Sequence, residues 1–112
     1  MDHPLYPESS AEIARKRKEL APAQLEAFQH FSRAVFADGA LPLVTKQLIA
    51  VAVAHTTQCP YCIRGHTAGA LKAGATEQQI MEAIWVAAEM RAGGAYAHSA
   101  LAIDVMQPQH GG

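Results

Sequence analysis

The sequence predicts an all-α protein, a helical bundle of about five to six helices, and three observations lead to this expectation. Alanine is abundant and spread along the chain, β-branched residues are not clustered, and no run alternates apolar and polar residues for long. Alanine has the highest helix propensity and strands show a period of two, so helix is favoured. The length of 112 residues predicts one domain over 1–112. We expect its core at about 20–105, between a flexible N-terminal segment and a flexible C-terminal tail.

The first two expected helices lie before residue 40. One spans about 10–19, with Ser9 or Ser10 as its cap. The next begins near Pro22, because proline suits a first helical turn, and ends at Asp38-Gly39. Apolar residues at helical spacing form a stripe along it: Leu25, Phe28, Phe31, Val35 and Phe36.

The middle of the chain predicts two further helices. A third runs from about 41 to 56, and its stretch Leu48–Ala54 is apolar all round. This predicts a central, buried helix, since a helix without a polar face needs cover on every side. A fourth begins at Pro60 and continues to about Ala73, where Gly74 supplies the C-terminal stop.

The last third of the chain opens on Thr76, whose spacing to Gln79 is that of a capping box. The helix that follows places several packing residues on one side, namely Ile80, Ile84, Ala87, Ala88 and Arg91, with Met81 and Trp85 beside them. Gly93-Gly94 is expected to break or kink the chain before a final helix over about 95–106. The tail 108–112 is expected to fray.

Composition limits the classes of partner. A formal net charge of −1 gives no electrostatic reason to expect nucleic acid or an anionic membrane as a partner. The N-terminus lacks a secretory pattern, and the longest apolar run is far too short for a membrane helix, so a soluble cytoplasmic protein is expected. Many packing residues are Ala or Gly, which leave little bulk for a monomer core. We therefore expect helix faces to be shared between subunits.

Two cysteines carry the chemistry that the sequence predicts. In the cytoplasm a pair spaced as Cys59 and Cys62 is more often catalytic or metal-binding than structural. If Pro60 opens a helix, Cys59 caps it and Cys62 lies in its first turn, where the backbone amides and the helix dipole favour a thiolate. His66 shares the helix face of Cys62 and can accept its proton. The two sulfurs are close enough to form a disulfide.

Two other interpretations of this cluster stay open. The cysteines could simply pack as small apolar residues. Alternatively Cys59, Cys62 and His66, with His55 as a fourth ligand, could bind a metal, although structural zinc sites usually draw on two separated ligand pairs. The interpretation that we favour needs no cofactor and no metal.

Two segments around the cysteines resemble a known family. Thr45–Ala54 followed by Gln58–Thr67, with the C-x-x-C-x-x-x-H pattern, is similar to the core of AhpD-like alkylhydroperoxidases in the carboxymuconolactone decarboxylase superfamily. Ala73–Ile80 and Met90–Gly94 look like the same family. The resemblance implies an AhpD-like helical fold, a homo-oligomer (a trimer or a hexamer), and thiol-dependent reduction of peroxides or disulfides in antioxidant defence, with electrons from an unknown thiol donor.

The resemblance also implies roles for single residues. Cys62 would attack the peroxide and Cys59 would resolve the sulfenic acid as a disulfide, although an exposure argument alone would let the cap residue Cys59 attack. Well-studied members carry a glutamate at the position of Gln47 as the outer member of a proton relay. A glutamine orients a ring but cannot accept a proton. Glu89 is our candidate for the missing acid, with an exposed or interfacial carboxylate as the alternative.

Two other functions remain as alternatives. One is decarboxylation of a lactone, as in the namesake enzymes of the superfamily, which generally lack the cysteine pair. The other is a non-enzymatic metal-binding or redox-sensing module.

Overall fold

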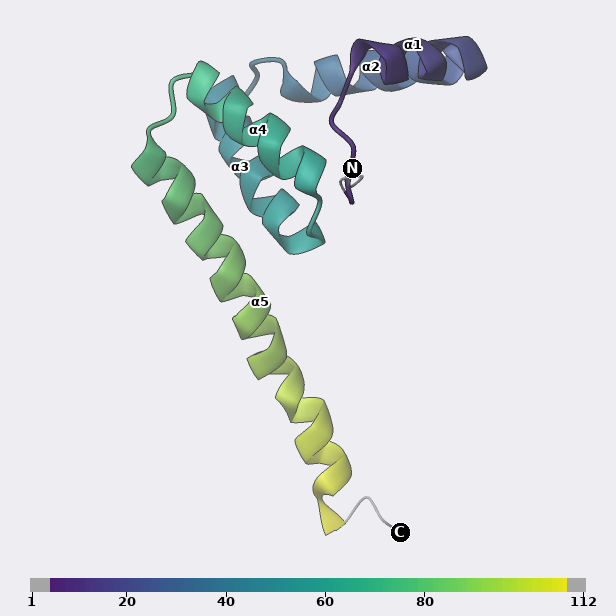
Figure 1. The fold of residues 1–112 in the computed structure, drawn as a ribbon. Helices are drawn as coiled ribbons and strands as arrows, with labels where there is room; N and C mark the ends of the chain where they lie inside the picture. The colour runs from purple at the N-terminus through teal and green to yellow at the C-terminus, as the bar shows by residue number, and fades with distance from the viewer. Residues whose placement is uncertain (1–4, 109–112) are drawn as a thin grey trace. The chain divides into compact units, whose positions relative to one another are not determined.

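The computed structural model describes residues 5–108, which form five α-helices and no strand. The helices are α1 (Ala11–Leu20), α2 (Pro22–Phe36), α3 (Leu43–Thr57), α4 (Pro60–Lys72) and α5 (Glu77–Met106) (Figure 1). The all-α prediction is therefore confirmed. The chain divides into two compact units at Leu43, the first holding α1 and α2 and the second holding α4, α5 and nearly all of α3. The expected fraying of 109–112 lies outside the described residues.

Local signals set the ends of α1 and α2. The Ser10 hydroxyl accepts the backbone N–H of Ile13 at 3.2 Å and caps α1 as expected. Pro22 occupies the first turn of α2, where its missing N–H costs nothing. Beyond α2, a carboxylate oxygen of Asp38 accepts the N–H of Leu43, the first residue of α3, at 2.6 Å. No residue of α1 or α2 is buried: in the apolar stripe of α2, Leu25 and Phe36 are half-buried and the other three side chains are exposed.

The second unit contains the core. α3 and α4 lie side by side, and the first half of α5 packs against them (Figure 1). The buried cluster is built mostly from small side chains, with Val51, Ala70, Ala75 and Ile80 at its centre and Val44, Leu48 and Ile84 packed against it. Small residues such as Ala70 let the helices approach closely, but they bury little apolar area per residue.

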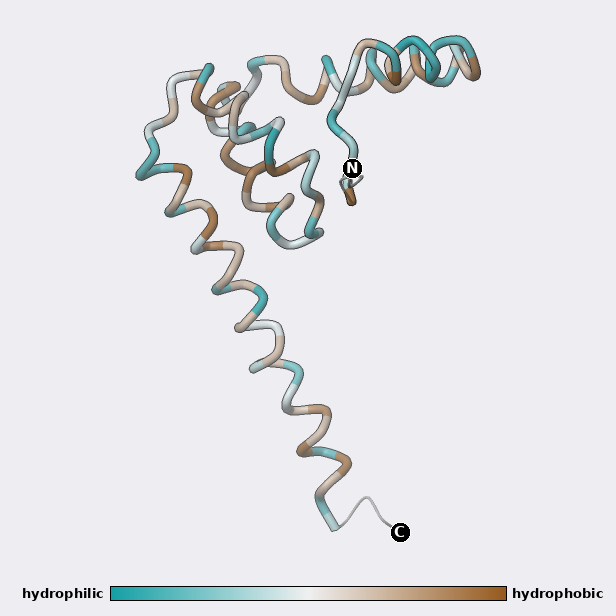
Figure 2. Tube along the Cα trace, in the orientation of Figure 1, coloured by the Kyte–Doolittle hydropathy of each residue, from teal (hydrophilic) through white to brown (hydrophobic). Residues whose placement is uncertain are grey.

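Burial of α3 differs from the prediction. Val51 and Ala54 are buried, yet Ile49 is 48% exposed and Val53 is 52% exposed. Figure 2 shows the apolar stretch of α3 as a brown segment of the trace. The expectation of a fully buried central helix is thus wrong for a single chain, because the second unit covers only one side of α3.

The predicted break at Gly93-Gly94 is also wrong. α5 runs without interruption for 30 residues through both glycines, so there are five helices and no separate helix over 95–106. A glycine inside a helix costs only about 1 kcal/mol relative to alanine and, unlike proline, keeps its N–H for the hydrogen-bond ladder. Gly74, by contrast, has a φ of +103° and ends α4 as predicted. The capping box at Thr76 and Gln79 is confirmed as well.

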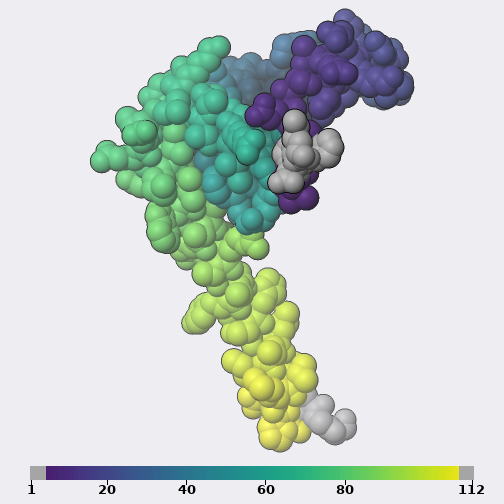
Figure 3. All heavy atoms as spheres, in the orientation of Figure 1, coloured from purple at the N-terminus to yellow at the C-terminus, as the bar shows by residue number. Residues whose placement is uncertain are grey.

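The second half of α5 extends beyond the other helices of its unit. Its yellow end in Figure 3 projects past α3 and α4. Large apolar side chains of this half are exposed among the described residues, and Tyr96 is 83% exposed. Among the described residues, no helix is both long and apolar enough to cross a membrane.

Candidate functional site

The cysteine pair lies at the junction between α3 and α4. Gln58 adopts a left-handed φ of 62°, and the N–H of Cys59 returns to the carbonyl of Ala54 at 3.2 Å. This is the Schellman pattern that commonly ends helices, although a glycine usually takes the left-handed position. The side-chain amide of Gln58 donates to the carbonyl of His55 at 3.0 Å and supports the turn. The chain therefore reverses direction immediately before the first cysteine.

Cys59 caps α4, as the spacing predicts. Its backbone is extended, and its Sγ accepts the backbone N–H of Cys62 at 3.3 Å. Both cysteines are free thiols and both are half-buried. The sulfur of Cys59 thus occupies the position that a serine or aspartate oxygen takes in ordinary helix caps.

The environment of the pair separates the two thiols. A hydrogen bond from the Cys62 side chain, then those from the backbone of Cys62 and Tyr61, lower the pKa of Cys59, although desolvation opposes them. The hydrogen bond to Cys59, desolvation and the charge of Cys59 raise the pKa of Cys62. The two shifts have opposite directions, so Cys59 loses its proton more readily than Cys62. In the reduced protein the thiolate therefore forms first at Cys59.

His66 and Gln47 are brought together by the packing of α4 on α3. The Oε1 of Gln47 lies 2.8 Å from the Nδ1 of His66. A carboxamide oxygen only accepts, so Nδ1 of His66 donates the hydrogen bond. Gln47 therefore orients the ring. Cys62 and His66 share a face of α4, but the structure records no hydrogen bond between them.

Gly69 leaves space for the contact between Gln47 and His66, and the sequence analysis did not identify this glycine. A Cβ on Gly69 would lie 3.0 Å from Cδ, Nε2 and Oε1 of Gln47. A side chain at this position would displace the amide that holds His66. A glycine inside an otherwise regular helix was the available signal.

Glu89 occupies an exposed position on α5. Its Oε1 lies 3.5 Å from where a Cβ on Gly93 would be. Within residues 5–108 no hydrogen bond joins Glu89 to His66, whose recorded carboxamide partner is Gln47. The role of Glu89 as the missing acid stays a prediction.

Arg91 is a second residue near the site that sequence reasoning did not single out. Its Nη1 donates to the backbone carbonyl of Thr56, in the last turn of α3, at 3.0 Å. The signal was a charged residue on the same side of its helix as Ile80 and Ala87, both of which are buried. Arg91 thus ties α5 to the segment that leads into Cys59.

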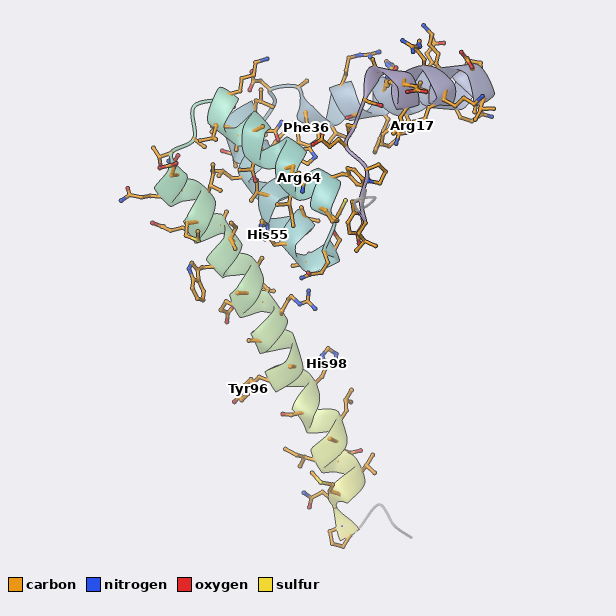
Figure 4. All side chains as sticks on the ribbon, viewed as in Figure 1. Arg17, Phe36, His55, Arg64, Tyr96 and His98 are labelled. Atoms are coloured by element: carbon orange, nitrogen blue, oxygen red, sulfur yellow. The ribbon has the colours of Figure 1, made fainter. Side chains whose placement is uncertain are left out.

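The other histidines have partners in their own helices. His55 donates from Nδ1 to the carbonyl of Val51 at 2.7 Å, and His98 does the same to Gly94 at 2.8 Å. Figure 4 shows His98 on the distant half of α5, away from Arg64 on α4. In the described part of the chain, no three His, Cys, Asp or Glu side chains are grouped so that they could hold a metal ion.

A cavity lies in the first unit, between α1 and α2. Its volume is about 530 Å³, and residues of α1, α2 and their connection line it: Ala14, Arg15, Arg17, Lys18, Pro22, Leu25, Glu26 and Gln29. None of the candidate site residues Cys59, Cys62, His66, Gln47 and Glu89 lines it. The candidate chemical site is therefore the α3–α4 junction.

Known proteins resemble this chain over most of its length. Residues 22–104 match the model of the carboxymuconolactone decarboxylase family. Uncharacterized protein 4 in the cox locus of Paracoccus denitrificans is 68% identical over 81 residues, which are 72% of this chain and 73% of that protein. An uncharacterized protein of Cupriavidus necator is 45% identical over 83 residues, or 72% of this chain and 74% of its own.

Solved structures share the fold. A carboxymuconolactone decarboxylase family protein from Legionella pneumophila has a TM-score of 0.65 at 38% identity and covers 70% of each chain. A protein from Methanobacterium thermoautotrophicum has a TM-score of 0.71 at 39% identity, covering 76% of this chain and 98% of its own. A Thermotoga maritima protein, at 22% identity, a TM-score of 0.68 and coverage of 92% and 96%, supports the fold alone.

Proposed function

The chain belongs to the carboxymuconolactone decarboxylase family, and we propose that it acts there as a thiol-dependent peroxidase or disulfide reductase of the AhpD-like type. The contact between Cys59 and Cys62 carries this proposal. The Sγ of Cys59 lies 3.3 Å from the backbone N–H of Cys62, and both cysteines are free thiols. Two half-buried thiols in contact within a single helical turn form a pair suited to reversible disulfide formation.

In the first step of the proposed cycle the Cys62 thiolate attacks the distal oxygen of a hydroperoxide. His66 accepts the proton that Cys62 loses, the S–O bond forms as the O–O bond breaks, and the leaving alkoxide takes the proton from His66, giving a sulfenic acid and an alcohol. The Cys59 thiolate then attacks the Cys62 sulfur, which releases water after protonation and closes the disulfide. A dithiol donor reduces the disulfide by exchange and leaves as its own disulfide.

The lowered pKa of Cys59 fits the resolving role. Attack on a sulfenic acid needs a thiolate, and the cap position supplies one without a further base. Cys62 has a raised pKa, so it needs a proton acceptor before it attacks the peroxide. His66 lies one turn along the same helix and is our candidate for that acceptor, with the Gln47 carboxamide holding its ring through Nδ1.

Oxidation by limiting peroxide tests the proposal. After cumene hydroperoxide treatment, mass spectrometry should show one new disulfide between Cys59 and Cys62. In Cys59→Ser, a sulfenic acid should accumulate at Cys62 and react with dimedone, whereas Cys62→Ser should stay unmodified. Arg64→Gln, a neighbouring surface change on α4, should behave as the wild type. An unreactive wild-type protein would refute the function, and a dimedone adduct at Cys59 in Cys62→Ser would reverse the order of attack.

Lactone decarboxylation is the competing activity that the family name suggests. It needs neither thiol, so the double variant Cys59→Ser, Cys62→Ser separates the two functions. Turnover of a carboxymuconolactone by this variant would favour decarboxylation. Loss of peroxide reduction without any lactone turnover would support the thiol mechanism.

The same proposal includes a cytoplasmic homo-oligomer, a trimer or a hexamer. Its support is the apolar surface that a single chain leaves uncovered, including Trp85 at 68% exposure and the exposed side chains of Ile49 and Val53 on α3. Exposed apolar surface of this kind is typical of subunit interfaces. Sedimentation velocity should give the mass of three or six chains, and a monomer at micromolar concentration would contradict the expectation.

A further inference from the structure

Arg91 reaches from α5 to the carbonyl end of α3. Its Nη1 lies 3.0 Å from the backbone oxygen of Thr56, although the two residues are 35 positions apart in sequence. The last carbonyls of a helix have no partner within the helix, and a cation at this end satisfies them and is stabilised by the helix dipole. The contact therefore joins the helix that follows the site to the helix that precedes it.

Two helix ends of opposite polarity meet at Cys59. The carbonyl end of α3 carries a partial negative charge, whereas the amide end of α4 carries a partial positive charge. The N–H of Cys59 is bound to Ala54 of α3, while its Sγ accepts the N–H of Cys62 of α4. A thiolate at Cys59 is thus stabilised by the partial positive charge of the α4 amide end and destabilised by the partial negative charge of the α3 carbonyl end. A cation bound to the carbonyls of α3 reduces this destabilisation, because it offsets their partial negative charge.

We propose that Arg91 is a positioning residue of the cysteine pair. Its guanidinium fixes the end of α3 and thereby maintains the hydrogen bond from the Cys62 N–H to the Cys59 sulfur. Its positive charge also offsets the partial negative charge of the α3 carbonyls. The inference deepens the proposed function and rests on it only for its catalytic meaning, since the hydrogen bonds themselves do not depend on peroxide chemistry. The adjoining helices carry further ionisable groups: Lys46 and His55 on α3, Tyr61, Cys62, Arg64, His66 and Lys72 on α4, and Glu77, Glu82 and Glu89 on the first half of α5.

Thiol alkylation measures this effect directly. The full-length variants Arg91→Gln and Arg91→Lys are reacted with iodoacetamide across a range of pH, and mass spectrometry follows modification of Cys59. Removing a charge at a helix end should slow alkylation near neutral pH by about two- to fivefold and shift the rate profile to higher pH. Arg91→Lys keeps the charge and one donor, so its rate should lie within about twofold of the wild type.

Arg64→Gln is the matched control, because it removes an exposed positive charge from α4 without touching Thr56. Unchanged alkylation in Arg91→Gln, or equal slowing in Arg64→Gln, would overturn the proposal. Circular dichroism checks the fold, and Arg91→Met carries the same test if the glutamine variant does not fold. Alkylation needs no peroxide, so failure of the wild type to reduce peroxide would refute the function while leaving this result intact.

Discussion

Replacing Gly69 with alanine places a methyl group where the Gln47 carboxamide lies. The new Cβ would be 3.0 Å from three atoms of that amide, closer than ordinary van der Waals contact allows. The amide must move by a few tenths of an ångström or more. The hydrogen bond of 2.8 Å to His66 has little tolerance for such a shift. We therefore expect Gly69→Ala to loosen the orientation of the His66 ring.

Gly65 provides a matched control on the same helix. A Cβ there meets nothing within 4 Å. Alanine in place of glycine inside a helix gains about 1 kcal/mol of stability, and both variants share this gain. Overpacking typically costs about 1–3 kcal/mol, and only Gly69→Ala incurs that cost. Gly65→Ala should thus stabilise the protein, while Gly69→Ala should be less stable than Gly65→Ala by about 1–3 kcal/mol.

Two assays separate stability from chemistry in these variants. Urea unfolding gives the free energy of unfolding, and stopped-flow oxidation by cumene hydroperoxide gives the rate of sulfenic acid formation. Loss of the His66 hydrogen bond should slow oxidation in Gly69→Ala by about two- to tenfold. Gly65→Ala should keep the wild-type rate. The reasoning is refuted if Gly69→Ala is as stable as Gly65→Ala and is oxidised at the wild-type rate.

Three further expectations follow from the same geometry. The pKa of Cys59 is lowered chiefly by the Cys62 side chain, so Cys62→Ala should shift the pH profile of Cys59 alkylation to higher pH, and an unchanged profile would contradict this assignment. Because the pKa of Cys59 is lower in the folded protein than in the unfolded chain, its thiolate stabilises the folded state at pH values above the unfolded pKa. This contribution is lost as the pH falls through the pKa of Cys59 in the folded protein. Gln47→Leu removes the acceptor for His66 Nδ1 and should slow peroxide oxidation by about two- to tenfold, measured by stopped flow, with both cysteines still forming a disulfide. Gly94→Ala lies inside a continuous helix with open space around its Cβ, so it should raise the free energy of unfolding by about 1 kcal/mol, whereas a break at this position would make the change destabilising.

Most helix boundaries could be predicted from the sequence because they depend on short-range rules. Pro22 and Pro60 open their helices, Gly74 ends α4 in a left-handed conformation, and the Thr76 capping box starts α5. Each of these signals acts within about one helical turn. The Gly93-Gly94 prediction failed because glycine lowers helix propensity without forbidding the helix, and the neighbouring residues Ala92, Ala95 and Ala97 have high helix propensity.

The sequence by itself also placed the candidate cluster. Its spacing predicted Cys59 as the cap of α4, with Cys62 in the first turn and His66 on the same helix face as Cys62, and the structure has Cys59 as the cap and the other two residues in α4. What surrounds the cluster depended on tertiary structure. Gln47 meets His66 across 19 residues and Arg91 meets Thr56 across 35, so these contacts exist only once α3, α4 and α5 have packed. Hydrogen bonds within a turn follow from residue spacing, whereas contacts between helices follow from which small residues, such as Gly69, allow the helices to approach.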